Sequence, residues 1–221
     1  MSNGSGLFSK KAPVIPHLNK NEIADLRQDV ADTLKPMAAI SVDEYTDPGT
    51  SAANNLKVAT ATVAAPVTLA TTDLLAPGLA ILAAGPRNVT FTTAGGTAAD
   101  APATATITGT GPDGKAQTEV VNLAQTATIA TGVKLFKTIT SIAYPAADGT
   151  GATIAIGVGK AMYLTKKPKV RAGLATPIKE VVAGAVVTNG VLDATNQSYT
   201  PSTAQDGSND YAVFYEYDAT F

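Results

Sequence analysis

One stretch of the chain, residues 87–159, alternates between apolar and polar residues and is divided by glycine-containing turns. At its centre, Thr106–Gly109 and Gln117–Val120 face each other across the turn Gly111-Pro-Asp-Gly114. Alternation at period two predicts strands, and a Pro-Asp-Gly turn between two such runs predicts a β-hairpin with a loop of about four or five residues. This hairpin constrains the fold more than any other feature of the sequence.

Further strand-like runs surround the hairpin. Residues 134–144 and 153–158 follow it and are separated by a second turn, Asp148-Gly-Thr-Gly151. Strands at regular spacing, with turns between them and no intervening helical pattern, predict an antiparallel β-sandwich or barrel and disfavour a parallel α/β fold. We therefore expect a mainly β fold whose sandwich core is residues 87–159. The side chains expected to face this core are Val89, Phe91, Ala105 and Ile107.

The N-terminal residues 1–18 have a different character, because they combine glycines and prolines with lysines and contain no acid. Two interpretations stay open for them. They form either a disordered terminus or an extended arm that becomes ordered against a neighbouring subunit. In the second case the apolar anchors are Leu7, Phe8 and Ile15, with Lys10 and Lys11 between them.

Residues 19–36 predict one short α-helix. Asn19 and Glu22 resemble a capping box, and Pro36 ends the pattern. Apolar residues recur between them at helical spacing, namely Ile23, Leu26, Val30 and Leu34. About four turns are too few for a coiled coil, so we expect this helix to lie across a sheet or a partner.

Residues 37–86 form a segment that is part β and part irregular, and the pattern leaves open whether it joins the central sandwich. Short strands are expected at 57–63 and 66–71, where Val and Thr suit a pleated surface. The apolar run 74–84 is predicted to be a buried strand or a loop under the sheet. It is also far shorter than the ~20 residues that cross a bilayer, so we expect no membrane partner.

Residues 160–221 are predicted to be β structure that completes the fold or forms an intersubunit seam. Val181–Val187 reads as a strand, followed by a tight turn at Asn189-Gly190. In the last twelve residues, aromatic and apolar side chains alternate, which predicts a final strand with one shared face. That face consists of Tyr211, Val213, Tyr215 and Tyr217.

Composition excludes several kinds of chemistry. The chain has no cysteine and one histidine, His17, which rules out disulfides and cysteine nucleophiles and leaves little for a zinc site or a catalytic triad. A net charge of −2 gives no global attraction to nucleic acid. Charged residues are 15% of a chain rich in Ala, Thr and Gly, so its core is modest and we expect oligomerisation or docking to assist it. Residues 1–11 contain no apolar leader region, so we expect synthesis in the cytoplasm.

Three clusters of charge remain as weaker candidates for a site. Asp43, Glu44 and Asp47 offer paired carboxylates, but glycosidases also need aromatic platforms, and the chain has no Trp. The loop from Asp206 to Asp210 reads as a polar turn in preference to a calcium loop. The third cluster, Lys160, Lys166, Lys167, Lys169 and Arg171, reads as a solvated basic face or a contact with an acidic protein. We expect no catalytic residue, cofactor or metal.

The hairpin region also resembles a known class of domain. Thr108-Gly-Thr-Gly-Pro-Asp-Gly114 followed by Thr118-Glu-Val-Val121 is similar to the strand–hairpin–strand pattern of immunoglobulin-like β domains in virion proteins of tailed bacteriophages. The resemblance covers residues 87–159, about a third of the chain. It implies a non-enzymatic structural protein of the virion, and the arm and flanking regions fit a head decoration (cement) protein that stabilises the capsid lattice.

The same resemblance implies partners. They are the major capsid protein or other virion proteins and further copies of the chain, with a trimer as the expected homo-oligomer. The residues expected to touch a partner are Leu7, Phe8, Lys10, Lys11, Ile15, Tyr211, Tyr215 and Tyr217. The alternative is a tail, baseplate or head-fibre component with a host-surface or carbohydrate-binding module. A depolymerase is a third and weaker possibility.

Overall fold

The computed structural model describes residues 39–95, 97, 100–123, 129–147, 151–170, 177–188 and 190–217. All of them belong to one compact unit, Ala38–Phe221. The arm predicted for residues 1–18 and the helix predicted for residues 19–36 lie outside the described residues, as does most of the predicted turn at 148–151.

The described part of the chain is mainly β, as the sequence predicts, and its strands pair antiparallel. In chain order the strands are β1 Ala39–Tyr45, β2 Ala52–Ala61, β3 Val67–Ala70, β4 Arg87–Ala94, β5 Thr104–Thr110, β6 Ala116–Asn122, β7 Ile129–Thr131, β8 Thr138–Tyr144, β9 Thr153–Tyr163, β10 Pro177–Val182, β11 Ala185–Val187, β12 Val191–Asp193, β13 Ser198–Thr200 and β14 Tyr211–Tyr217. A 3₁₀ turn, η1 (Thr71–Asp73), and a helix, α2 (Ala76–Ala84), lie between β3 and β4.

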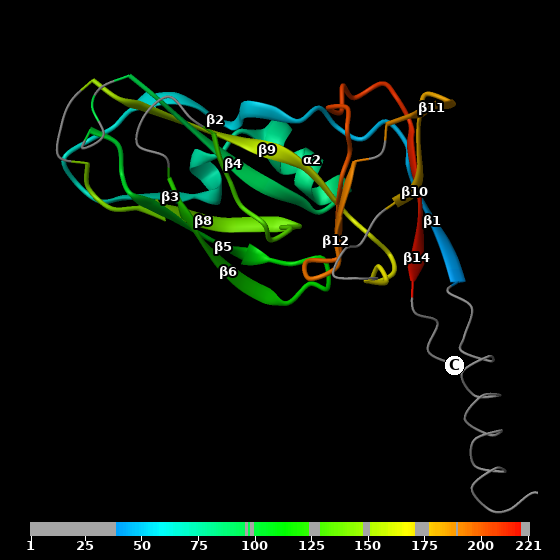
Figure 1. The fold of residues 1–221 in the computed structure, drawn as a ribbon. Helices are drawn as coiled ribbons and strands as arrows, with labels where there is room; N and C mark the ends of the chain where they lie inside the picture. Colours follow the sequence, from blue (N-terminus) through cyan, green and yellow to red (C-terminus); the bar gives the residue numbers. More distant parts are fainter. Residues whose placement is uncertain are drawn as a thin grey trace, which may run out of the picture. The chain divides into compact units, whose positions relative to one another are not determined.

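The strands form three sheets (Figure 1). Sheet A has the order β1-β14-β10-β11, and sheet C has the order β3-β8-β5-β6. Sheet B has the order β12-β13-β9-β4-β7, and β2 also pairs with β9. The structure thereby answers what the sequence left open about residues 37–86, because β2 and β3 join the two sheets of the sandwich whereas β1 joins sheet A.

The predicted hairpin is present as β5 and β6. Thr110 pairs with Ala116, which leaves a five-residue loop. The loop is closed by a hydrogen bond of 2.9 Å from the Gly111 N–H to the Lys115 carbonyl, and Gly114 adopts a φ of +76° that favours glycine. Gly109 is needed for a different reason, since a Cβ there would lie 2.0 Å from the Thr138 carbonyl oxygen on β8.

The first hydrophobic core takes its side chains from sheets B and C, which therefore pack in a sandwich-like arrangement. The predicted inward residues Val89, Phe91, Ala105 and Ile107 are all fully buried in it. Burying a side chain the size of Phe or Ile stabilises the fold by about 1.5–3 kcal/mol. The alternation of apolar and polar residues therefore predicted correctly which side chains of these strands are buried.

The segment 74–84 is not the strand or loop that the sequence predicts, because most of it forms helix α2. Pro77 lies in the first turn, where its fixed φ favours a helix, and Gly85 ends the helix with an N–H bonded to the Ile81 carbonyl at 3.0 Å. Gly78 faces β2 so closely that a Cβ would meet the Asn55 carbonyl oxygen at 2.5 Å. The helix is apolar on every side, so it carries no periodic polar stripe that a sequence pattern could register.

A second hydrophobic core joins sheet A to the end of β9 and to β12 and β13. Strand β9 serves both cores, since Ile156 belongs to the first and Met162 to the second (Figure 1). Val181–Val187, predicted as one strand, is instead the hairpin β10–β11. Ala183 and Gly184 both have positive φ, the conformation of a two-residue primed turn that matches the twist of paired strands.

Candidate interaction surface and buried polar network

The acidic residues at 43, 44 and 47 do not converge on one site. Successive side chains of β1 point to opposite faces, so Asp43 is buried at 5% exposure and Glu44 is exposed. Asp43 accepts hydrogen bonds from the Tyr215 hydroxyl at 2.7 Å and from the Thr165 N–H at 2.9 Å. The Asp47 N–H, meanwhile, donates to the Asp210 carboxylate at 3.0 Å. Asp43 is therefore a structural acceptor inside the second core.

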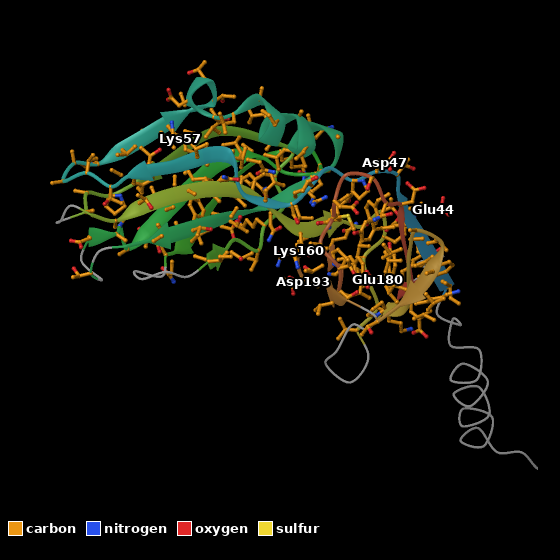
Figure 2. The ribbon with its side chains drawn as sticks, turned by 90° about the horizontal axis from the view of Figure 1, so that it is seen from above. Glu44, Asp47, Lys57, Lys160, Glu180 and Asp193 are labelled. Atoms are coloured by element: carbon orange, nitrogen blue, oxygen red, sulfur yellow. The ribbon has the colours of Figure 1, made fainter. Side chains whose placement is uncertain are left out.

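Glu180 on β10 is a second buried carboxylate. Its Oε2 accepts from the N–H groups of Gly190 at 2.8 Å and Ser202 at 3.3 Å. Burial and a hydrogen bond with this carboxylate raise the pKa of Tyr199 well above its ordinary value of 10.0. Figure 2 shows Glu180 among the side chains that fill this part of the fold, in contrast to Glu44 at its periphery. Glu180 thus fixes the loops on either side of β12 and β13.

Arg87, the first residue of β4, is buried at 3% exposure where the two cores meet. Its Nε donates to the Gly159 carbonyl at 3.1 Å, its Nη2 has no hydrogen-bond partner, and burial lowers its pKa to about 10. It lines a pocket of about 320 Å³ together with Tyr45, Tyr163 and Glu44. Because two of its lining residues, Glu44 and Asp47, are acidic, their negative charge makes the pocket poorly suited to an anion.

The buried carboxylates Asp43 and Glu180 therefore support the structure. Most of the hydrogen bonds to Asp43 and Glu180 come from backbone N–H groups and from tyrosine or threonine hydroxyls. In the part of the chain that the structure describes, no group of three or more His, Cys, Asp or Glu residues could hold a metal ion. Over the same residues, no helix is long and apolar enough to cross a membrane.

The glutamate of the hairpin motif has an identifiable structural role. Glu119 on β6 is buried and accepts hydrogen bonds from the N–H of Val133 at 2.6 Å and from the N–H of Lys134 at 3.2 Å. A Cβ on Gly132 would lie 2.7 Å from its Oε2, so the turn passes directly over the carboxylate. Glu119 thereby ties the segment that follows β7 to the hairpin.

Of the residues predicted to touch a partner, five lie outside the described residues: Leu7, Phe8, Lys10, Lys11 and Ile15. The prediction for Tyr211 and Tyr215 needs correction, because they are 2% and 0% exposed inside the second core. The reason is that these two side chains point to the face of sheet A that packs in the second core, whereas Ala212 and Phe214 of the same strand point to the other face. Tyr217 alone remains partly exposed, with the Lys166 ammonium 5.9 Å from the centre of its ring.

The other two charged clusters are a polar turn at Asp206 and a set of mostly exposed lysines. Asp206 accepts hydrogen bonds of 3.0 Å from the N–H groups of Ser208 and Asn209, which is the polar turn that the sequence predicts. Lys160 on β9 and Lys167 are exposed, whereas Lys169 is partly buried. Arg171 and His17 lie outside the described residues.

Sequence reasoning missed the surface that stands out most, which we call the outer face of sheet A. It is the side of sheet A that faces away from the second core, and large apolar side chains are exposed on it, Ile40 at 62% and Val42 at 43% among them. Ile40 and Val42 alternate with the polar residues Ser41 and Asp43, and this alternation could have predicted a strand with one apolar face. The face consists of Ile40, Val42, Glu44, Lys179, Val181, Val186, Ala212, Phe214 and Glu216.

A scan against protein-family models and searches of curated proteins and of solved structures found no match to this chain.

Proposed function

We propose that this chain is a non-enzymatic structural protein of a tailed-bacteriophage virion, where it acts as a head decoration (cement) protein that binds and stabilises the capsid lattice. One observation carries the proposal. The buried carboxylates Asp43 and Glu119 are engaged within the subunit's own fold, while apolar residues such as Val42 are exposed on a sheet face. An exposed apolar sheet face of this kind favours a binding role for the chain.

The hairpin motif supports the same proposal. Its resemblance to virion β domains rests on a glycine and a glutamate that each have a physical role here. Gly109 permits close approach of β8, and Glu119 holds the turn at Val133. Because these motif residues stabilise the fold, they favour a structural role for the domain.

The alternative function is a tail, baseplate or head-fibre component that binds a host glycan. A pocket of about 370 Å³ beside β9 offers hydroxyls from Ser51 and Thr90 and the cation Lys160. None of its lining residues is aromatic, so it lacks the flat apolar platform that sugar rings commonly stack on. This favours the decoration protein over the glycan-binding module.

The experiment mixes purified chain with capsids that lack it and measures co-sedimentation and the temperature at which the capsids break. We expect saturable binding at a stoichiometry set by the lattice symmetry, together with a higher disruption temperature. A chain without residues 1–18 should lose binding and keep its circular dichroism spectrum. Absence of binding by the full chain would refute the proposed function, whereas binding by the shortened chain would refute only the role of the arm.

A glycan array and a polysaccharide-clearing assay test the alternatives. The decoration protein is expected to bind no glycan and to clear no polysaccharide. Specific glycan binding, together with failure to bind capsids, would favour the fibre or tail component instead.

A further inference from the structure

The pocket beside Arg87 lies where three segments of the described chain meet, namely the chain that leaves β1, the C-terminal end of α2 and the end of β9. The Tyr45 hydroxyl joins two of these segments by donating to the Tyr163 carbonyl at 2.8 Å. The loop after β1 also passes close to α2, because a Cβ on Gly49 would lie 2.6 Å from the Ile81 side chain. The pocket of about 320 Å³ is therefore formed by the fold itself, and it has room for a single amino-acid residue.

Part of the pocket wall is negatively charged. Glu44 and Asp47 are both exposed, and neither carboxylate has a hydrogen bond or ion pair within the described residues (Figure 2). The C-terminal end of α2, which also lines the pocket, adds partial negative charge. The Leu82 carbonyl has no intrahelical donor there, because the residue four positions on is Pro86, which has no N–H. This part of the wall therefore favours a cation with several hydrogen-bond donors.

Arg87 gives the pocket a second requirement. Its side chain is 3% exposed, its Nε donates to the Gly159 carbonyl, and its Nη2 has no hydrogen-bond partner within the described residues. A buried donor without an acceptor destabilises the fold, so a ligand that brings an acceptor to it is favoured. A carboxylate is a poor acceptor for this place, because Glu44 and Asp47 repel it. A neutral carbonyl oxygen meets the requirement without that repulsion.

Much of the remaining wall is apolar or aromatic, with Pro48, Ile81, Met162 and Tyr163 among the lining residues. An aliphatic stem can pack on these side chains while its charged end stays beside the carboxylates. The pocket thus suits a ligand with a carbonyl, an apolar stem and a cationic end. A lysine residue within a peptide chain has all three, and its ammonium carries several donors.

We propose that this pocket binds a lysine residue of a partner protein, with the lysine ammonium paired to Glu44 and Asp47 and the residue's backbone carbonyl accepting from Arg87 Nη2. A metal cation would leave Arg87 without an acceptor, and an anion would be repelled by the two carboxylates. This binding does not depend on the proposed function, because the isolated chain presents the pocket whatever particle it belongs to.

The test titrates the full chain at neutral pH with Nα-acetyl-lysine N-methylamide and follows the backbone amide signals by NMR. Glu44, Asp47 and Gly85 report on the pocket, and Lys115 in the hairpin loop is the reference signal. Ligands of this size typically bind with a dissociation constant of about 1 mM, so a titration to about 20 mM reaches saturation. We expect saturable shifts at the residues that line the pocket. Their absence up to about 20 mM would overturn the proposal.

Two incomplete ligands separate the contacts. Nα-acetyl-norleucine N-methylamide has the carbonyl and the stem but no ammonium, whereas pentylamine has the stem and the ammonium but no carbonyl. We expect each to bind at least about fivefold more weakly than the complete ligand. Pentylamine tests the role of Arg87 without substituting a buried residue. Either incomplete ligand binding as tightly as the complete one would overturn the proposal, because one of the two contacts would then be absent.

Variants of the carboxylates locate the ammonium. Glu44→Gln combined with Asp47→Asn should raise the dissociation constant of the lysine ligand about tenfold and leave that of the norleucine ligand unchanged. The matched control is Asp113→Asn, which removes an exposed carboxylate from the hairpin loop and should change the lysine ligand's affinity by less than about twofold. The amide spectra verify that the variants remain folded. Equal affinities of the double variant and the control for the lysine ligand would overturn the proposal.

Discussion

The Tyr215 hydroxyl donates a hydrogen bond of 2.7 Å to the carboxylate of Asp43, joining residues 172 positions apart in the sequence. Asp43 also accepts from the Thr165 N–H, just beyond the end of β9. One buried carboxylate therefore links β1, β14 and the chain that leaves β9. This contact holds sheet A against the strand that runs through both hydrophobic cores.

The first prediction concerns this carboxylate. Asp43→Ala removes the acceptor of the part-buried Thr165 N–H and leaves the buried Tyr215 hydroxyl only the Lys166 carbonyl at 3.2 Å, and each lost acceptor costs about 1–3 kcal/mol. We expect the free energy of unfolding to fall by about 2 kcal/mol, whereas Tyr215→Phe lowers it by about 1 kcal/mol because the carboxylate then keeps its bond from the Thr165 N–H. Urea denaturation followed by circular dichroism measures both. A loss below about 0.5 kcal/mol for Asp43→Ala would contradict the linking role.

Apolar and polar residues alternate in residues 87–159, and this pattern made the core side chains of the sandwich predictable. Val89, Phe91 and Ile107 were placed correctly because a half-buried strand shows its burial in the order of its residues. The roles of Gly109 and Glu119 were not predictable in this way. They depend on Thr138 and Val133, and no local pattern indicates which distant backbone group will approach a side chain.

Two glycines of the hairpin give the second prediction. A Cβ on Gly109 would overlap the Thr138 carbonyl, so Gly109→Ala must separate β5 from β8, and we expect a loss of more than about 3 kcal/mol in unfolding free energy. Gly114 has a positive φ but open space around it, so Gly114→Ala should cost only about 1 kcal/mol. Thermal denaturation compares the two. Equal losses would show that close strand approach is not what requires Gly109.

The third prediction concerns the hydrogen bonds that the Glu119 carboxylate accepts from the segment after β7. Glu119→Gln keeps the shape of the side chain but replaces charge-assisted hydrogen bonds to the Val133 and Lys134 N–H groups with weaker ones. We expect a loss of about 1–2 kcal/mol and faster hydrogen exchange at Val133. Val120→Ala, at the neighbouring exposed position, is the control and should change stability by less than about 0.5 kcal/mol. Unchanged hydrogen exchange at the Val133 amide would show that Glu119 does not hold this segment.

The fourth prediction is a loss of stability at alkaline pH. Burial raises the pKa of Tyr45 and Tyr199 above the ordinary 10.0, with Asp43 adding to the shift at Tyr45 and Glu180 at Tyr199. Because these phenols lose their protons more readily in the unfolded chain, their stabilisation is complete below pH 10 and is lost as pH rises above it. Arg87 acts in the opposite sense, since its folded pKa of about 10 lies below the ordinary 12.5.

We expect the tyrosines to dominate, so the free energy of unfolding should fall between pH 10 and 12. Urea titrations at each pH, with tyrosinate absorbance recorded in parallel, measure this. Tyr199→Phe should reduce the slope and Tyr45→Phe should reduce it further. A stability that rises with pH over this range would mean that Arg87 outweighs the phenols.

Other parts of the structure were missed for reasons that the residues make clear. Helix α2 is apolar on every side, so Leu79 and Leu82 fit a strand, a loop or a helix equally well. The hairpin β10–β11 was hidden because Ala183 occupies a positive-φ position that usually takes Gly, Asn or Asp. Tyr215 was assigned to an interface because an aromatic stripe looks the same in a core as at a surface. What separates the two is whether other parts of the chain cover that face of β14, and here Met162 and Tyr199, distant in the sequence, pack in the same core as Tyr215.

We propose that this chain is a building block of a virion head. The most direct measurement is electron microscopy of particles in which each copy of the chain carries a label at Lys115, an exposed residue of the hairpin loop. We expect label distributed over the head surface at positions repeated by the capsid lattice. Label confined to the tail, or absent from purified particles, would contradict it.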